Sequence, residues 1–281
     1  MKIAYGTYAM PTVPLEEAIP GLARVGYEGV EICIGPEHVG AQVEALDAAR
    51  RQTLSGLLED NGLGVPALFW LGSIYTPDAA QHQRNLDQIR ALAQLGRDLG
   101  MAEPPVIALG IGGRKGDWDT IRDDIVRLLH DYAALAEKEE IVVAGEAHFG
   151  AAVDCTDRAA WLFGRVNHPR IRMHFDIVHM FLAGDSIEYA VNTLVPFTGH
   201  THVTDAIKNE DGSFALVLVG KGQLDVTAYV QAMYAAGWND FITLEVSRMV
   251  WGQEDYNTWD AAQWCYEVLS EAFTEARVPR G

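Results

Sequence analysis

The sequence predicts an α/β fold, a single-domain (β/α)8 TIM barrel that takes up residues 1–281. Short apolar segments alternate with amphipathic segments of helical period, a pattern typical of a parallel sheet covered by helices. Eight apolar segments recur at intervals of roughly 30 to 40 residues, the length of one β/α unit. A chain of 281 residues also fits the usual size of an eight-unit barrel.

The eight strands are expected to begin near Lys2, Gly29, Gly64, Pro105, Ile141, Ile171, His200 and Phe241. Helices are expected between them, at residues 15–25, 48–61, 86–99, 121–136, 157–166, 187–194, 226–236 and 259–273. Thr156 or Asp157 is the expected cap of the fifth helix, and Ser186 that of the sixth. Glycine follows several of these helices, as it does at many helix ends.

An open doubly wound sheet is the alternative architecture. The first turn between strand and helix, residues 6–11, reads Gly-Thr-Tyr-Ala-Met-Pro and carries no GxGxxG fingerprint for a dinucleotide. No linker or low-complexity tract divides the chain. A closed barrel is therefore favoured, with the tail after residue 275 loosely attached.

Composition and charge exclude several classes of function. The formal net charge of −18 opposes binding to nucleic acid, whose affinity for proteins comes mostly from clustered Lys and Arg. No apolar run of about 18 residues predicts a membrane span, and the amino terminus reads straight into a strand without a leader. Three widely separated cysteines, Cys33, Cys155 and Cys265, fit buried or half-buried thiols in a cytoplasmic compartment.

Four residues of metal-ligand type stand at or near the ends of the last four expected strands: Glu146, Asp176, His202 and Glu245. Each has a plainer interpretation when taken alone: a salt-bridged rim carboxylate for the two glutamates, a helix N-cap for the aspartate, and a core imidazole for the histidine. The carboxyl ends of parallel strands meet at one mouth of a barrel. The four together therefore predict a metal site at that mouth.

The chain resembles the sugar isomerase/epimerase superfamily, the barrels related to xylose isomerase and endonuclease IV. The resemblance covers nearly all of the chain. It is carried by the opening at residues 2–4, by Gly-Tyr-Glu-Gly-Val-Glu at 26–31, and by Gly-His-Thr-His at 199–202. Gly-Lys-Gly at 220–222 and Gly-Trp-Asn-Asp-Phe at 237–241, which leads to Glu245, complete it.

In the epimerase branch of this superfamily, one divalent metal is held by Glu, Asp, His and Glu from strands five to eight. The resemblance places these roles on Glu146, Asp176, His202 and Glu245, and a substrate-contacting role on His179. Three carboxylates and one imidazole favour Mn²⁺, with Mg²⁺ or Co²⁺ as alternatives. The implied reaction is isomerisation or epimerisation of a carbohydrate. One glutamate removes a proton next to a carbonyl, an enediolate forms, and the other glutamate returns a proton.

The sequence also departs from the ketose 3-epimerase pattern. Ala152 stands where a second glutamate is common, and Lys208 lies where an arginine often contacts substrate. His148 follows the first ligand in a different loop, and it or His179 would serve as general acid in a lyase of the inosose dehydratase or keto-glycoside-cleaving type. Trp70 is a candidate for stacking on a sugar face, with packing as the equal alternative.

Two further readings come from other classes of function. A DNA-repair nuclease like endonuclease IV would need more metal ligands and a basic groove, which the acidic composition disfavours. A non-catalytic sugar-binding barrel would bind metal without exchanging substrate protons. The expected partner is thus a small sugar or keto-sugar, with no nucleic acid and no membrane. Whether the chain forms a homo-oligomer is left open by the sequence.

Overall fold

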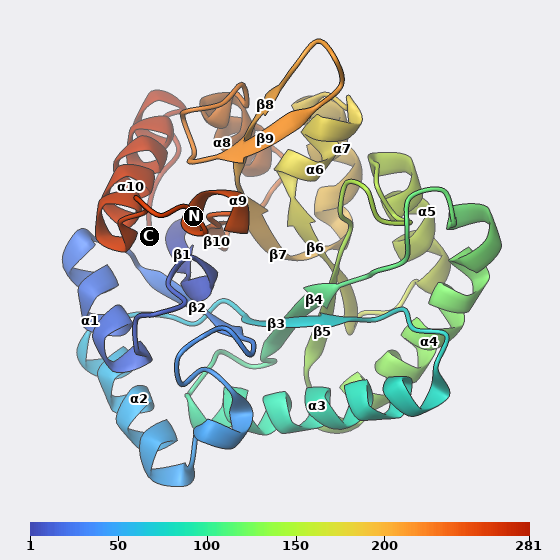
Figure 1. Cartoon of the computed structure of the whole chain (residues 1–281), viewed down its shortest axis with the longest axis horizontal. Helices are drawn as coiled ribbons and strands as arrows, with labels where there is room; N and C mark the ends of the chain where they lie inside the picture. The colour runs from blue at the N-terminus through green and yellow to red at the C-terminus, as the bar shows by residue number, and fades with distance from the viewer.

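A computed structural model describes residues 1–281 as a closed eight-stranded parallel barrel inside a ring of helices (Figure 1). The strands follow one another around the barrel in the order β1-β10-β7-β6-β5-β4-β3-β2, so each new β/α unit adds beside the last. The predicted architecture is confirmed. The barrel strands are β1 (Lys2–Gly6), β2 (Gly29–Ile34), β3 (Leu68–Ser73), β4 (Val106–Gly110), β5 (Val142–Glu146), β6 (Ile171–Asp176), β7 (Thr198–Val203) and β10 (Phe241–Leu244).

The helices surround the barrel and join consecutive strands (Figure 1). The longer ones are α1 (Leu15–Val25), α2 (Ala48–Asp60), α3 (Ala79–Asp98), α4 (Trp118–Glu139), α5 (Thr156–Val166), α7 (Ile187–Leu194), α8 (Val226–Ala235) and α10 (Thr258–Glu275). Two short helices complete the set: α6 (Ile177–Ala183) follows β6 directly, and α9 (Arg248–Trp251) follows β10 after three intervening residues. Ser186 caps α7 as predicted, by accepting a hydrogen bond from the backbone N–H of Tyr189. None of the helices combines the length and the apolar character needed to cross a membrane.

The third β/α unit differs most from the expected boundaries. Gly64 makes only an isolated bridge to Gly29, and β3 begins four residues later at Leu68. Pro66 lies in between and has no N–H to donate to a ladder, which delays regular pairing. Helix α3 begins at Ala79, seven residues before the predicted start, because its first turns are polar and show no apolar period.

A two-stranded hairpin that the sequence did not predict follows β7. It consists of β8 (Asp205–Lys208) and β9 (Phe214–Val217), which pair antiparallel. The hairpin lies between α6 and α9 on the carboxyl side of the barrel (Figure 1). Its Phe214 packs edge-on against Phe149 of the loop after β5, with ring centroids 5.6 Å apart.

One carboxylate anchors the base of this hairpin. Asp205 is fully buried and accepts backbone hydrogen bonds from Ala206, Gly220, Gly222 and Leu224. These bonds satisfy a buried charge without a cationic partner, as buried polar groups require. They hold the segment after β9 against the start of β8.

The interior of the barrel leaves room for polar side chains near the mouth. Side chains alternate across each strand, so every second residue points to the barrel axis. Small residues, among them Ala67, Ala108 and Ala144, form a buried cluster with Cys33 and Phe69. All three cysteines are free thiols, as expected, with Cys33 and Cys265 buried and Cys155 half-buried.

Candidate active site at the barrel mouth

Four side chains of metal-ligand type meet at the carboxyl ends of neighbouring strands. Glu146 and Asp176 are the last residues of β5 and β6, His202 lies in β7, and Glu245 directly follows β10. One ligand atom from each of Glu146, Asp176 and His202 lies within 4.8 Å of the others. The Nδ1 atom of His202 is 3.6 Å from Oε2 of Glu245. The structure thus brings together the four residues that the sequence singled out.

Asp176 combines two of the roles that the sequence left open. One carboxylate oxygen, Oδ1, caps α6 by accepting a hydrogen bond from the backbone N–H of Val178 at 3.0 Å. The other, Oδ2, is buried and has no hydrogen-bond partner. Burial, and next the negative charges of Glu245 and Glu146, raise the pKa of Asp176 well above its ordinary value. An unpaired carboxylate therefore points into the cluster, where a cation would offset its charge.

The pKa of Glu146 is shifted in the opposite direction from that of Asp176, because an imidazole lies beside Glu146. Burial alone would raise its pKa, but the contact with His179, and next the charges of His148 and His202, lower it. The Nε2 atom of His179 lies 3.6 Å from Glu146 and 3.7 Å from Asp176. Burial lowers the pKa of His179 itself. The mouth therefore holds two neighbouring carboxyl groups, Glu146 and Asp176, whose pKa values are shifted in opposite directions.

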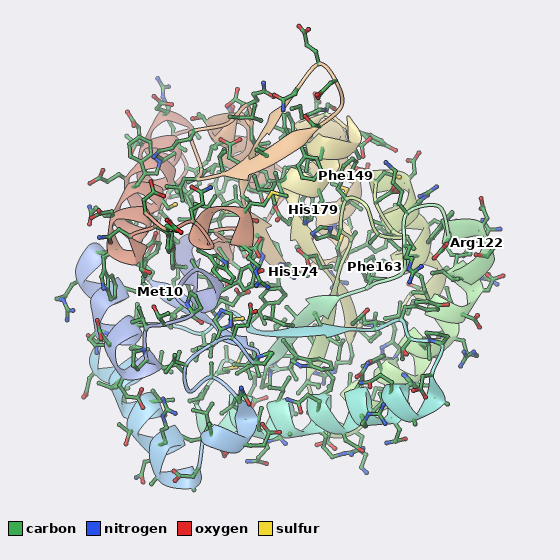
Figure 2. All side chains as sticks on the ribbon, in the orientation of Figure 1. Met10, Arg122, Phe149, Phe163, His174 and His179 are labelled. Carbon is green, nitrogen blue, oxygen red and sulfur yellow. The ribbon has the colours of Figure 1, made fainter.

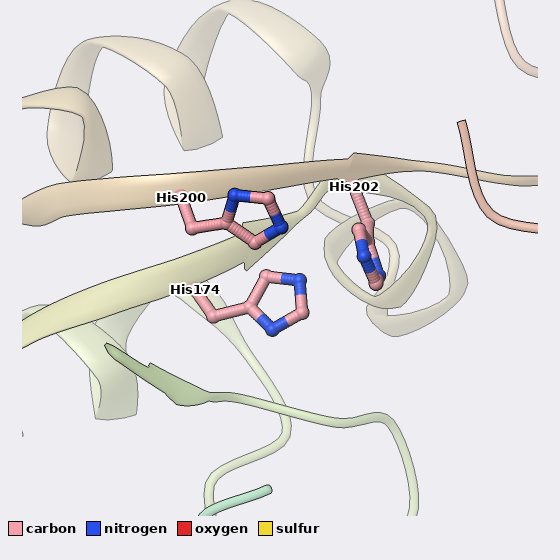
Figure 3. Close-up of side chains that lie close together, drawn as sticks. All are labelled: His174, His200 and His202. Atoms are coloured by element: carbon pink, nitrogen blue, oxygen red, sulfur yellow. The ribbon is translucent and has the colours of Figure 1, made fainter. Parts of the chain in front are cut away.

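Beneath the mouth lies a second layer of polar residues that the sequence reasoning did not assign. Figure 3 shows the rings of His200 and His202 from β7 beside that of His174 from β6. Glu31 of β2 accepts hydrogen bonds from Nε2 of His200 at 2.6 Å and from Nε2 of His202 at 2.8 Å. Burial raises the pKa of Glu31, but the charge of His202 and the two hydrogen bonds lower it to about 2. A sequence signal existed, because a lone acid inside an apolar strand is costly unless paired.

His174 is the least satisfied member of this layer. Both of its ring nitrogens are buried without a hydrogen-bond partner. Burial, and next the proximity of His202 and His200, place its pKa well below the ordinary value, so the ring is neutral. Its edge-on contacts with His202 and Phe69, at centroid distances of 4.1 Å and 5.6 Å, make it a packing element of the barrel interior. Figure 2 shows it inside the ring of helices.

The predicted substrate-contacting residues are placed at different distances from this cluster. His179 contacts it directly, and the exposed His148 packs against His179 with ring centroids 3.8 Å apart and ring planes tilted by 41°. Lys208 lies on the hairpin, where its ammonium donates to the carbonyl of Phe181 at 3.1 Å. Trp70 neighbours the inward-facing Phe69 and lines a cavity with residues of α3, on the outer side of β3. The packing alternative thus describes Trp70, and it is not part of the mouth.

An aromatic wall lies on the β1 and β2 side of the site, and it includes Trp251, which the sequence offers as a cover for the site or as part of a subunit contact. Tyr8 stacks on His38 with centroids 5.7 Å apart and meets Trp251 edge-on at 5.5 Å. Burial, followed by the charge of Glu245, raises the pKa of Tyr8. The indole nitrogen of Trp251 is buried without an acceptor. Aromatic faces opposite a cluster of carboxylates suit a ligand with both apolar C–H faces and polar oxygens.

A cavity of about 760 Å³ lies at the opposite end of the barrel. It is lined by residues that precede or begin the strands, such as Gly64, Val106 and Val142, together with Arg172. It contains none of the clustered ligand-type side chains. In barrels of this kind, chemistry is carried by the carboxyl ends of the strands, so the side-chain cluster identifies the site and the size of a cavity does not.

The residues present at the mouth fit a divalent metal ion. Asp176 Oδ2 and His202 Nδ1 are both buried without partners, and Glu146 and Glu245 add further carboxylate oxygens. Carboxylates and one imidazole suit Mn²⁺, Mg²⁺, Co²⁺ or Zn²⁺. The inner histidines form a second close group, but Glu31 already satisfies two of them. The mouth group is therefore the better candidate for an ion.

Comparisons with known proteins agree with this geometry. The model of the family described as xylose isomerase-like TIM barrel matches residues 21–268. The structure of IolI protein with a binding zinc atom superposes with a TM-score of 0.78, at 16% identity over 98% of both chains. No curated protein sequence matches the chain significantly.

Two other solved structures are similar at the level of the fold. The structure of an L-ribulose 3-epimerase has a TM-score of 0.77 and 18% identity, and covers 98% of this chain and 95% of its own. The probable 3-DHS dehydratase AsbF from Bacillus anthracis, involved in petrobactin synthesis, has a TM-score of 0.76 and 18% identity, over 96% of this chain and 99% of its own. Structures described as an epimerase and as a probable dehydratase thus share this barrel fold.

Proposed function

Since the chain belongs to the xylose isomerase-like TIM barrel family, we propose that it is a divalent-metal-dependent carbohydrate isomerase or epimerase. The observation that carries the proposal is the buried mouth cluster, in which the ligand atoms of Glu146, Asp176 and His202 lie within 4.8 Å. An ion held there would supply positive charge to polarise a substrate carbonyl and make the neighbouring C–H bond more acidic. Mn²⁺ is the proposed ion, since carboxylate oxygens suit hard divalent ions of this kind.

Proton transfer is assigned to the two glutamates. In the barrel order, β7 and β6 lie between β10 and β5, so Glu245 and Glu146 flank His202 and Asp176. A substrate carbon over the middle of the cluster would meet one carboxylate on each side. One removes the α-proton to give an enediolate, and the other returns a proton to the opposite face, which inverts that carbon.

The imidazoles and the aromatic wall position the substrate. His179, neutral and in contact with Glu146 and Asp176, presents a ring to a substrate oxygen. Tyr8 and Trp251 form an apolar surface across the mouth and limit the access of water to the reacting carbon. Lys208 would have to leave the Phe181 carbonyl to reach a substrate.

A lyase on the same site is the second candidate function. The observation that favours it is His148, which is exposed at the rim and packs against His179. Its Nδ1 donates to the carbonyl of Phe149 at 2.8 Å, so Nε2 remains free. After loss of the same α-proton, a protonated His148 would give its proton to a departing β-oxygen and leave an unsaturated ketone.

Incubation of the Mn²⁺-loaded protein with ketoses and 3-keto-glycosides in D₂O separates the two functions. Epimerisation places deuterium at the inverted carbon and forms no new chromophore. Release of an aglycone or appearance of an unsaturated ketone, without exchange into any ketose, would establish the lyase instead. A protein that shows no metal by elemental analysis after loading, and no thermal shift on chelation, would rule out both.

A further inference from the structure

Glu31 is a charged residue in a place where an apolar one would be expected. It lies in the middle of β2, has no exposed surface, and faces the barrel axis. A carboxylate there is costly unless hydrogen bonds satisfy it. Glycine at position 6 makes room for it, since a Cβ at Gly6 would come within 2.8 Å of Glu31 Oε1. The barrel is thus built to hold a carboxylate at this point.

The contacts of Glu31 determine which nitrogen of His202 faces the mouth. His202 donates its Nε2–H to Glu31 Oε2 at 2.8 Å, and its Nδ1 is buried without a hydrogen-bond partner, 3.6 Å from Glu245. Ligating histidines usually donate their second ring N–H to a carboxylate, which fixes the tautomer and makes the ligating nitrogen more basic. We infer that Glu31 is a positioning residue, which holds His202 with Nδ1 as the metal-binding atom.

His200 also helps to position Glu31. It donates its own Nε2–H to the same oxygen of Glu31, at 2.6 Å, and has no role among the ligands at the mouth. Two donors on one oxygen fix the carboxylate in place. β2 and β7 are not neighbours in the barrel, so this bond pair also ties two separated strands together.

The ring plane of His202 is fixed by packing as well. His174 meets it edge-on at a centroid distance of 4.1 Å, and Phe69 does so at 5.3 Å. His174 has no hydrogen bond to any residue, so it does not compete for Glu31. The imidazole of His202 is therefore held by one hydrogen bond and by two edge-on aromatic contacts, which leave its ring little freedom to rotate.

This inference rests on the proposed metal-dependent function, and its test uses metal affinity and tautomer state without substrate. Affinity for Mn²⁺ and Zn²⁺ is measured by competition with a chelator in the wild-type protein, Glu31→Gln and His200→Gln. We expect each substitution to weaken binding about 10- to 100-fold. Cys33→Ala is the matched control, because Cys33 is buried two residues further on the same strand and faces the same interior. It should change affinity less than twofold.

A measurement on the unaltered protein covers the case in which a variant fails to fold. In the Zn²⁺-loaded protein with ¹⁵N-labelled histidine, nuclear magnetic resonance should show His202 with a proton on Nε2 and zinc on Nδ1. Zinc on Nε2, or wild-type affinity in folded Glu31→Gln, would overturn the inference while leaving the proposed function standing. Absence of metal binding by the wild-type protein would overturn both.

In the competing arrangement, the inner histidines His174, His200 and His202 bind a second metal ion. In that case the wild-type protein would bind two ions per chain, and His174→Asn would bind one. A stoichiometry of one in both proteins supports the positioning role. A fall from two to one in His174→Asn would show that the histidines around Glu31 are ligands, and would replace it.

Discussion

Replacement of Asp176 by asparagine is expected to stabilise the metal-free protein and to abolish its stabilisation by metal. Asparagine keeps the oxygen that caps α6, since both residue types are good N-caps. It removes a buried negative charge whose raised pKa shows that its surroundings disfavour ionisation. The substitution therefore separates the structural role of this residue from its electrostatic one.

The magnitude follows from the distance between the charges. The ligand atoms of Asp176 and Glu146 lie within 4.8 Å, and two like charges at that separation repel by about 3.5 kcal/mol at an effective dielectric constant near 20. The negative charge of Glu245 adds to this repulsion, and the positive charge of His202 offsets part of it. A net gain of about 1 to 2 kcal/mol is left, which corresponds to a rise in Tm of about 2 to 4 °C for a chain of this size.

Thermal unfolding with and without metal provides the assay. In excess chelator, Asp176→Asn should melt above the wild-type protein. At a metal concentration about 100-fold over Kd, the wild-type protein should gain about 2.7 kcal/mol and overtake the variant, whose Tm should hardly move. Glu210→Gln, an exposed acid on the hairpin tip, should shift neither curve. A metal-free variant that melts below wild type, or one that keeps the full metal response, would refute the reasoning.

Three other outcomes are expected. Glu146→Gln and Glu245→Gln should each lower kcat about 10²- to 10⁴-fold with the fold intact, because each variant loses a base. Turnover near the wild-type rate in either variant would show that the replaced glutamate does not transfer the proton. Gly222→Ala should cost about 1 to 3 kcal/mol in urea unfolding, because its Cβ would lie 2.2 Å from the carboxylate that anchors the hairpin. Glu16→Gln should cost less than about 1 kcal/mol at pH 7, because the Glu16–Arg50 ion pair is partly exposed. The hydrogen bond from Arg50 lowers the pKa of Glu16, so this cost should vanish as the pH falls below about 4.3 and through that lowered pKa.

Matched variants separate these effects from general damage. Gly56→Ala adds a Cβ in the middle of α2, where nothing lies within 4 Å, and should stabilise the protein by about 0.5 to 1 kcal/mol. Equal losses in Gly56→Ala and Gly222→Ala would argue against the crowding at Asp205. A Glu16→Gln cost that grows at acid pH would contradict the sign of its pKa shift.

Local periodicity was enough to predict the barrel, because strand and helix patterns follow from which face of each element is apolar. The four mouth residues could also be predicted from the sequence. The carboxyl ends of all strands in a parallel barrel meet at one mouth, so a residue at a strand end lies there even if the exact strand boundaries are not known. The late start of β3 carries a signal in Pro66 that the expected start at Gly64 does not take into account. The early start of α3 has no such signal, because the first turns of this helix are polar.

The inner layer of Glu31, His200 and His202 could not be predicted from the sequence, for a different reason. Glu31 is satisfied only by His200 and His202, which lie 169 and 171 residues away in the chain. A contact across the barrel axis leaves no local spacing to recognise. Trp70 was misplaced because side chains of a strand point alternately to its two faces. A shift of one residue decides whether an aromatic residue near a strand end faces the mouth or the helices, and composition does not specify that shift.

The anchoring of the β8–β9 hairpin by Asp205 has a consequence for how such a barrel can change its preferred ligand. The four backbone hydrogen bonds to this carboxylate lie at the base, and the tip from Asn209 to Ser213 is exposed and contributes nothing to them. Insertions or exchanges at the tip would therefore leave the ladder and the mouth intact. The hairpin is a site where new loops can be grafted, by evolution or by design, at little cost to folding.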